Sequence, residues 1–331
     1  MDRRQQLQCW IETRLNASPL ALEVASADAS FRRYFRVRTA GASLIAMDAP
    51  PEHEDCARFV RIAALMADAN LHVPKVIAQD LERGFLLLSD LGTVSYLQAL
   101  NADSADGLFG DAIAALLRWQ LASKPDVLPP YDEALLALEL ELFREWYLGR
   151  HLGLELSVAQ HQALDTVFAL ILENNLAQPA VYVHRDYMPR NLMVCEPNPG
   201  VLDFQDAVFG PIAYDVASLF KDAFVSWEEE RVLDWTARYW EQAKRARLPV
   251  AADFGSFYHD FEWIGLQRHL KVLGIFARLY YRDGKRGYLE DTPRFVTYVR
   301  AVAVRYHALA PLRAIFDAIE NKSHASAGYT F

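Results

Sequence analysis

The sequence predicts an α+β fold, in which a small, strand-rich N-terminal part precedes a large and mainly helical remainder. Two observations support this prediction. Short apolar runs that alternate with polar residues are concentrated in the first ninety residues. Beyond them, long segments carry the apolar spacing of amphipathic helices up to the C-terminus, with one strand-like interruption at residues 181–207.

The N-terminal part begins with a predicted helix, because Leu7, Ile11 and Leu15 recur at every fourth residue and share one face. A hairpin follows, since two β-type runs flank the turn sequence Thr-Ala-Gly-Ala and the pair Pro50-Pro51 ends the second run. The elements expected here are a helix at 2–16, a hairpin at 31–47, a helix at 54–69 and strands at 73–80 and 84–90.

The remainder of the chain reads mostly as helices, and its one interruption contains three short β-type runs. A turn at Asn198-Pro199-Gly200 separates the last two of these runs. The helices are expected at about 106–123, 132–150 and 157–177, and the β-type runs at 181–184, 192–195 and 200–203.

The charge balance is acidic, with 34 Lys and Arg residues against 43 Asp and Glu residues and a net charge of −9. An acidic excess argues against nucleic-acid partners, which need a basic surface. No segment has the length and apolarity of a secretory signal or a membrane span, so we expect a cytoplasmic protein that does not contact a membrane. Cys9, Cys56 and Cys195 lack metal-ligand spacing, and the apolar run before Cys195 favours a buried, inert thiol.

The strand-like interruption contains the residues that could take part in catalysis. His184-Arg185-Asp186 follows a predicted strand, and a turn there would expose the Asp186 carboxylate to accept a proton from an attacking hydroxyl. Asn191 and Asp203 flank a predicted hairpin, which would bring their side-chain oxygens together. Mg²⁺ prefers a small number of such oxygen ligands, completed by water and phosphate. A base and two metal ligands are the residues that phosphoryl transfer requires.

These residues and their spacing resemble the catalytic loop of kinases and the metal-binding Asp downstream of it. Gln205 follows Asp203-Phe204 where a glycine is usual, and this departure, with the helical C-terminal region, resembles the aminoglycoside phosphotransferase and choline kinase family. The resemblance implies a two-lobed, protein-kinase-like fold that uses ATP and Mg²⁺. It also implies that Asp215 braces the catalytic loop, although a carboxylate favoured by the helix dipole explains that position equally well.

The same resemblance predicts how the chain divides. Residues 1–89 would form an N-lobe that covers the nucleotide phosphates, and residues 90–331 a C-lobe with the catalytic loop, metal and acceptor site. The hinge between them is expected near 88–92. Because backbone groups of the hinge usually bind adenine, Ser89 and Leu91 are the nucleotide-binding candidates there.

The N-terminal lobe departs from the family at two positions. Met47 stands where a strand lysine is expected, and Phe59 lies roughly where a helix glutamate should pair with that lysine. The two losses fit together, because a buried glutamate without its cation would be an unpaired charge. We then expect the phosphates to be bound by the turn that leads into the first run of the hairpin, whose candidates are Ser30, Phe31, Arg32 and Arg33.

This departure leaves two interpretations open. One is a pseudokinase that binds a nucleotide or a protein without turnover, and the other is a working enzyme with a different phosphate-binding cation. Intact Asp186, Asn191 and Asp203 favour the working enzyme.

A narrower resemblance extends over nearly the whole chain. Segments such as DASFRRYFRV, LIAMDAPPE and VLDFQDAVFGPIAYD resemble the anomeric sugar kinases of cell-wall recycling, which use ATP to phosphorylate the C1 hydroxyl of N-acetylmuramate and N-acetylglucosamine. The implied partner is a small amino sugar, and nothing in the sequence indicates an obligate protein partner. An aminoglycoside, a choline-like alcohol or homoserine remains the alternative acceptor. Charge of both signs on the candidate acceptor helices disfavours a polycation, and the acceptor candidates are Arg144, Glu145, Trp146 and Arg268.

Overall fold

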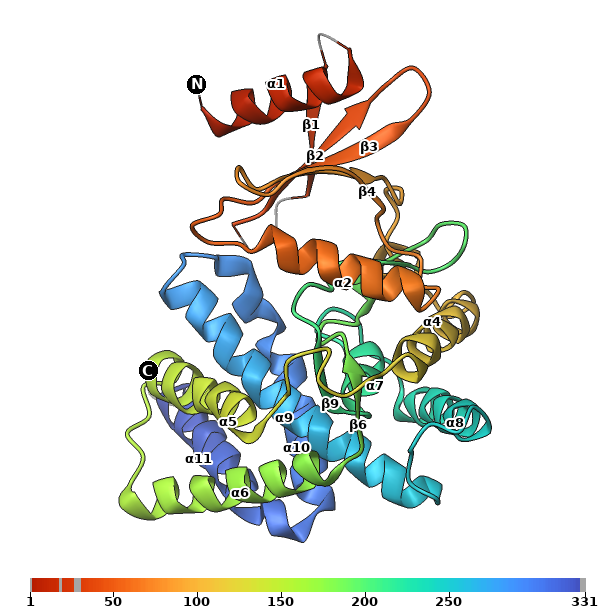
Figure 1. Ribbon diagram of the computed structural model, residues 1–331. Helices are drawn as coiled ribbons and strands as arrows, with labels where there is room; N and C mark the ends of the chain where they lie inside the picture. The colour runs from red at the N-terminus through yellow and green to blue at the C-terminus, as the bar shows by residue number, and fades with distance from the viewer. Residues whose placement is uncertain (1, 18–19, 27–30, 328–331) are drawn as a thin grey trace. The chain divides into compact units, whose positions relative to one another are not determined.

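The structure is a computed structural model that describes residues 2–17, 20–26 and 31–327. The chain forms two compact units (Figure 1). One contains the residues up to 122 together with 189–207, and the other contains 123–188 together with 208–331. The predicted catalytic segment, residues 181–207, is therefore divided between the units after Met188. The division of the chain at 88–92 remains a prediction from the sequence.

The first unit is built on an antiparallel sheet of five strands within the described residues, in the order β1-β2-β3-β5-β4. The predicted hairpin and the two later strands are confirmed, whereas β1 was not predicted. The helices before and after the hairpin are also confirmed as α1 and α2. The bounds are α1 (Arg3–Leu15), β1 (Leu22–Ser26), β2 (Arg33–Arg38), β3 (Ser43–Asp48), α2 (Cys56–Asp68), β4 (Val76–Asp80) and β5 (Phe85–Ser89).

The sheet lies between α1 and α2 (Figure 1). Successive side chains of β2 point alternately to the α1 side and to the α2 side of the sheet. Phe35 and Val37 are buried in a cluster with Leu7 and Trp10 of α1. Arg33 shares their face, since it lies two residues before Phe35. The residues between, beginning with Arg32 just before the strand, point to the α2 side.

The remaining elements of the first unit hold the second half of the catalytic segment. Leu192 pairs with Val201, and this short hairpin places Asn191 and Asp203 at its two open ends, as predicted. The isolated bridges of His72 with Gly200 and of Ser95 with Met193 attach the hairpin to the rest of the unit. The bounds are α3 (Tyr96–Ala99), α4 (Ala105–Leu121), η2 (Pro189–Asn191), β7 (Leu192–Met193) and β8 (Gly200–Val201).

The second unit is mainly helical and is organised around the long helix α9, which packs against α5, α6, α7, α10 and a π-helical stretch, η1 (Figure 1). The helix expected at 132–150 is confirmed, but its second half is η1. A strand that was not predicted, β9, pairs with β6. The bounds are α5 (Glu133–Leu142), η1 (Phe143–His151), α6 (Val158–Ala177), β6 (Ala180–Val183), β9 (Val208–Pro211), α7 (Tyr214–Phe220), α8 (Glu229–Arg245), α9 (Phe254–Tyr281), η3 (Arg286–Asp291), α10 (Thr292–Arg305), η4 (His307–Leu309) and α11 (Ala310–Ala327).

Within the described residues, none of these helices has both the length and the apolarity needed to cross a membrane.

Candidate active site

Asp186 lies in a loop that begins where β6 ends, and backbone hydrogen bonds fix the shape of this loop. The fully buried carboxylate of Asp215 accepts the N–H of His184 at 2.7 Å and the N–H of Arg185 at 3.0 Å. Asp215 thus braces the loop, as the resemblance implied. His184 acts within the loop as well, because its Nδ1 accepts the N–H of Asp186 at 3.2 Å. The Asp186 carboxylate is half-buried rather than fully exposed.

The loop contains a residue in an uncommon backbone conformation. Arg185 has a φ of 76°, in the left-handed region that few residues other than glycine adopt. Such strain persists only where surrounding contacts impose it, and it concentrates at functional sites. Burial raises the pKa of Asp215 to about 7, although the two N–H groups that it accepts act in the opposite direction.

The Arg185 side chain anchors the loop to a buried charge cluster, which we define as Glu139, Arg185, Lys271, Gln267 and Tyr131. Glu139 lies 2.5 Å from Arg185 and 2.8 Å from Lys271, and it also accepts the Gln267 amide at 3.0 Å and the Tyr131 hydroxyl. Burial would raise the pKa of the Glu139 carboxyl, but Lys271 and Arg185 outweigh burial and lower it to about 2. The cluster therefore contains an ionised carboxylate at neutral pH.

Replacing Glu139 with glutamine is expected to destabilise the protein, because two cations would stay buried without their anion. The loss at neutral pH should be about 3–5 kcal/mol in the free energy of unfolding. Since the folded pKa of about 2 lies below the ordinary 4.5, the stabilisation by this carboxylate is complete above pH 4.5 and declines as the pH falls toward 2. Urea unfolding at pH 7 and at acid pH measures both effects.

Glu141→Gln is the matched control, because Glu141 is an exposed carboxylate two residues further along the same helix and pairs with Arg144 at the surface. Exposed pairs of this kind contribute about 0–1 kcal/mol. Equal losses for the two variants at pH 7 would contradict the assigned role of Glu139.

The two predicted metal ligands lie together at the open end of the β7–β8 hairpin. The amide nitrogen of Asn191 is 3.5 Å from Oδ2 of Asp203, whose side chain is 39% exposed. Gln205 donates its amide to Oδ1 of Asp203 at 3.0 Å, so the residue that replaces the usual glycine orients the carboxylate. Asp203 itself has a φ of 61°. In the described chain no three His, Cys, Asp or Glu side chains gather as metal ligands, and one carboxylate with one amide fits Mg²⁺ better than a transition metal.

The residues of the phosphate-covering turn have different surroundings. Ser30 lies outside the described residues. Phe31 is 61% exposed and its ring stacks on His53, with centroids 4.1 Å apart. Arg33 forms an ion pair with the fully buried Asp48, which also binds Arg3 of α1. The Arg33 guanidinium thus ties β2 to β3 and α1.

Arg32 lies between two carboxylates. Its guanidinium is 3.4 Å from Oδ1 of Asp203 and 3.4 Å from Oε2 of Glu54, and its side chain is 11% exposed. Burial opposes the charge of Arg32, but the Tyr34 hydroxyl, Asp203 and Glu54 outweigh it and raise the Arg32 pKa. Arg32 is therefore a fixed cation beside a predicted metal ligand.

The two positions that lack the usual lysine and glutamate are filled by apolar packing. Met47 is 1% exposed on β3, opposite Tyr34 and Leu86 of the neighbouring strands. Phe59 of α2 is also buried, and its ring centroid is 4.8 Å from that of Phe204. The aromatic contact joins α2 to the residue directly after Asp203.

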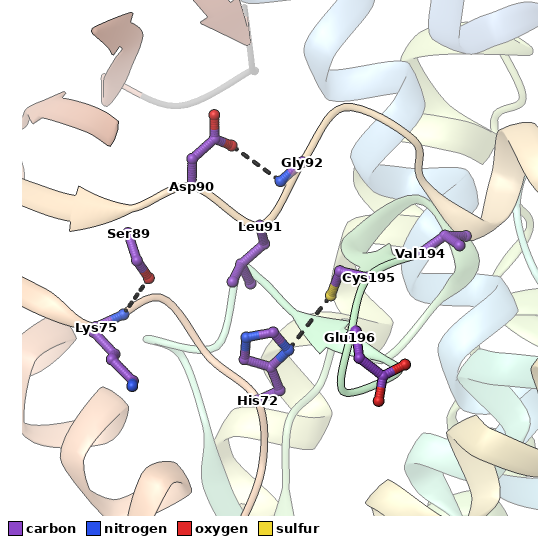
Figure 2. A pocket seen from close by; sticks show the side chains of 9 residues that line it. All are labelled: His72, Lys75, Ser89, Asp90, Leu91, Gly92, Val194, Cys195 and Glu196. Atoms are coloured by element: carbon purple, nitrogen blue, oxygen red, sulfur yellow. Dashed lines mark hydrogen bonds between the residues drawn. The ribbon is translucent and has the colours of Figure 1, made fainter. Parts of the chain in front are cut away.

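A pocket of about 420 Å³ lies where the hinge was predicted (Figure 2). Ser89 and Leu91 line it, as do His72, Lys75 and Cys195. His72 donates its Nδ1–H to the carbonyl of Pro197 at 2.6 Å, which leaves Nε2 as the acceptor of the neutral ring. Figure 2 shows this nitrogen on the side of the ring away from Cys195.

The prediction that Cys195 is a buried thiol is wrong. Its side chain is partly exposed and lines the pocket, with its sulfur 3.4 Å from Nδ1 of His72. Burial nonetheless raises the pKa of this thiol, which keeps it weakly nucleophilic.

Asp90 fixes the backbone of the pocket. Arg36 of β2 binds its carboxylate through two nitrogens, at 2.6 and 3.0 Å, and the N–H of Gly92 adds a bond of 3.0 Å. Burial tends to raise the pKa of Asp90, but the bonds from Arg36, Ser43 and Gly92 lower it. The Asp90 side chain thus fixes the backbone on both sides of Leu91, through Arg36 and through the N–H of Gly92.

Residues 21–252 match the phosphotransferase enzyme family. The chain belongs to this family. It is 53% identical to an N-acetylmuramate/N-acetylglucosamine kinase of Pseudomonas putida, over 98% of both chains. It is 46% identical to a protein of the same name from Neisseria meningitidis, over 100% of both chains. Among solved structures, an aminoglycoside phosphotransferase in a ternary complex with streptomycin and ATP superposes with a TM-score of 0.58 at 14% identity, covering 88% of this chain and 95% of that one.

These similarities confirm the predicted kinase-like fold and show that the chain is an enzyme of the phosphotransferase class.

Two of the acceptor candidates of this phosphotransferase are arginines with very different environments. Arg144, in η1, pairs with Asp165 and Glu141 and lies over the Phe168 ring, so its charge is already compensated. Arg268, in α9, is 3% exposed, and its guanidinium approaches the carbonyl of Lys221 at 3.5 Å and the sulfur of Met188 at 3.7 Å. Arg268 is thus in contact with the residue two positions after Asp186.

The other two acceptor candidates lie near Arg144 in the sequence. Glu145 is exposed and Trp146 is half-buried, and both belong to η1. Their role as acceptor contacts stays a prediction.

Sequence reasoning missed several residues of this phosphotransferase. Glu54, Gln205 and His72 contact predicted site residues or line the predicted pocket, but none was a candidate. Only Gln205 had a sequence signal, since it directly follows Asp203-Phe204. For Glu54 and His72 the relevant partners are distant in sequence, so no local pattern indicated them.

Proposed function

We propose that this phosphotransferase transfers the terminal phosphoryl group of ATP to the C1 hydroxyl of N-acetylmuramate or N-acetylglucosamine. The observation that supports it most is the near-complete similarity to proteins named as kinases of these two sugars, at 46–53% identity. The product, a sugar 1-phosphate, is the form from which a UDP-sugar can be made, which fits a place in cell-wall recycling.

Asp186 is the general base in this proposal. Its carboxylate accepts the proton of the C1 hydroxyl while the hydroxyl oxygen bonds to the terminal phosphorus and the bond to the ADP oxygen breaks. The bonds from Asp215 and His184 hold the backbone of Asp186 in the orientation that proton transfer needs. His184 is assigned a role in shaping the loop, because its Nδ1 accepts the N–H of Asp186.

Asn191 and Asp203 would hold Mg²⁺, which neutralises charge on the phosphates when it is bound. Gln205 donates to the Asp203 carboxylate and would hold it in place for that role. Arg32 contacts Asp203 and would therefore bind phosphate oxygens next to this metal site.

Adenine is assigned to the pocket at Ser89–Leu91. Its volume suits a small ligand, and the Asp90–Arg36 ion pair keeps the backbone groups between β5 and α3 in fixed positions. The His72 Nε2 adds one acceptor that sequence reasoning did not provide.

On the acceptor side, we assign Arg268 to the lactyl carboxylate of N-acetylmuramate. It is the better candidate of the two arginines, because it is buried next to the loop that contains Asp186. The contact with Met188 places Arg268 on the segment that bears the base.

The product identifies the reaction. Incubation with ATP and either sugar should give a phosphorus NMR signal coupled to the anomeric proton, and the phosphate should be released in mild acid because the ring oxygen assists cleavage of the C1–O bond. Coupling to a methylene group would mean that a different hydroxyl is phosphorylated. Turnover of an aminoglycoside, choline or homoserine but neither sugar, or of no acceptor at all, would overturn the proposal.

A further inference from the structure

We propose that Glu54 positions Arg32 on the nucleotide phosphates, so that these two side chains replace the lysine and glutamate that the sheet and the helix lack. The inference rests on the proposed function only in taking ATP as the bound nucleotide. It concerns the residues that bind the nucleotide phosphates, and it does not depend on which acceptor is phosphorylated.

The contacts define a bridging guanidinium. Nη1 of Arg32 faces Oε2 of Glu54 and Nη2 faces Oδ1 of Asp203, each at 3.4 Å. The Arg32 side chain is 11% exposed and that of Glu54 is 17% exposed. Two carboxylates on different nitrogens fix the plane of the guanidinium, which a single partner would leave free to rotate.

The backbone holds both partners of the pair. Arg32 directly precedes β2 and shares the α2 side of the sheet with Tyr34. Glu54 directly precedes Asp55, whose carboxylate caps α2 by accepting the N–H groups of Ala57 and Arg58. Because the cap fixes the start of α2, it also fixes where the Glu54 side chain emerges.

Neighbouring cations have other partners. Arg33 is bound to Asp48 on the α1 side of the sheet, and Arg58 lies 3.4 Å from Asp206. Met47 and Phe59 present only apolar groups at the two positions that usually supply the charge pair. Arg32 is thus the cation that contacts the predicted metal ligand, and Glu54 is its second carboxylate.

The pair can be tested by a double-mutant cycle on ATP affinity, measured by calorimetry with Mg²⁺ and without acceptor. Arg32→Gln should weaken ATP binding about 100-fold and Glu54→Gln about 10-fold, as for truncated partners of a buried charged contact. If Glu54 acts through Arg32, the double variant should resemble Arg32→Gln alone. Independent roles would instead multiply to about 1,000-fold.

Glu52→Gln provides the matched control, since Glu52 is an exposed carboxylate of the same loop. This substitution removes the same charge as Glu54→Gln. It should bind ATP like the wild type. All variants should keep their melting temperatures within a few degrees, and Glu54→Gln should leave the Michaelis constant for the sugar unchanged. A merely structural role for Glu54 would lower the melting temperature and spare ATP affinity.

The outcomes separate this inference from the proposed function. If Glu54→Gln binds ATP like the wild type, or if the losses multiply, the inference is wrong while the proposed function stands. If the wild-type protein binds no ATP, both the inference and the proposed function are wrong. Because the titration contains no acceptor, the result for Glu54 is the same whichever alcohol is phosphorylated.

Discussion

Asp186→Asn is expected to lower turnover by about two to four orders of magnitude while the protein stays folded and binds ATP normally. Asparagine preserves the shape of the side chain and removes only the carboxylate that accepts the proton. The bonds that shape the loop use the backbone N–H groups of His184, Arg185 and Asp186, and the substitution leaves all three in place.

Three measurements on the purified variant check this expectation: turnover with the amino sugar, ATP affinity by calorimetry, and the melting temperature. Normal affinity and melting temperature with a large loss of turnover identify a base. Turnover close to that of the wild type would remove the assignment, and a large drop in melting temperature would point to a role in folding.

The second large effect is expected at the metal site, where Asp203→Ala should abolish measurable turnover. The substitution removes the carboxylate proposed to bind Mg²⁺ and one of the two partners of Arg32. It should weaken the binding of Mg²⁺-ATP much more than that of ATP measured with a chelator, because only the former uses the metal contact.

Asn191→Ala is the comparison, since water can replace a neutral amide ligand when Mg²⁺ is saturating. Its loss should be smaller and should diminish as Mg²⁺ is raised. Calorimetry that shows equal losses for Mg²⁺-ATP and free ATP in Asp203→Ala would contradict the metal role.

Much of the site was predictable because its residues lie within one short segment. Asp186, Asn191 and Asp203 are separated by a few residues and one hairpin, so local turn and strand patterns were enough to bring the last two together. The brace by Asp215 was implied by the family resemblance, whereas its place at the start of α7 alone explained the carboxylate equally well.

The phosphate-binding side was less predictable, because its contacts join parts of the chain that local patterns cannot connect. Alternation along β2 indicated that one of Arg32 and Arg33 points inward, but only the neighbours of each show which one. Glu54 stood at the first position of the helix expected at 54–69, whereas it lies in the loop before α2, where no pattern in the sequence indicated its contact with Arg32. Cys195 was misjudged because its apolar neighbours suggested burial, whereas the bridge between His72 and Gly200 places its loop beside the pocket.

The buried charge cluster also limits how this protein can diverge. The Glu139 carboxylate balances the charges of Arg185 and Lys271, and all three side chains are too buried for water to screen their charges well. Substitution of Glu139 alone would leave two uncompensated cations next to the predicted catalytic loop, so single substitutions in the cluster are strongly disfavoured. Passage to an uncharged arrangement requires concerted replacement, and these three positions should therefore covary across descendants as one evolutionary unit.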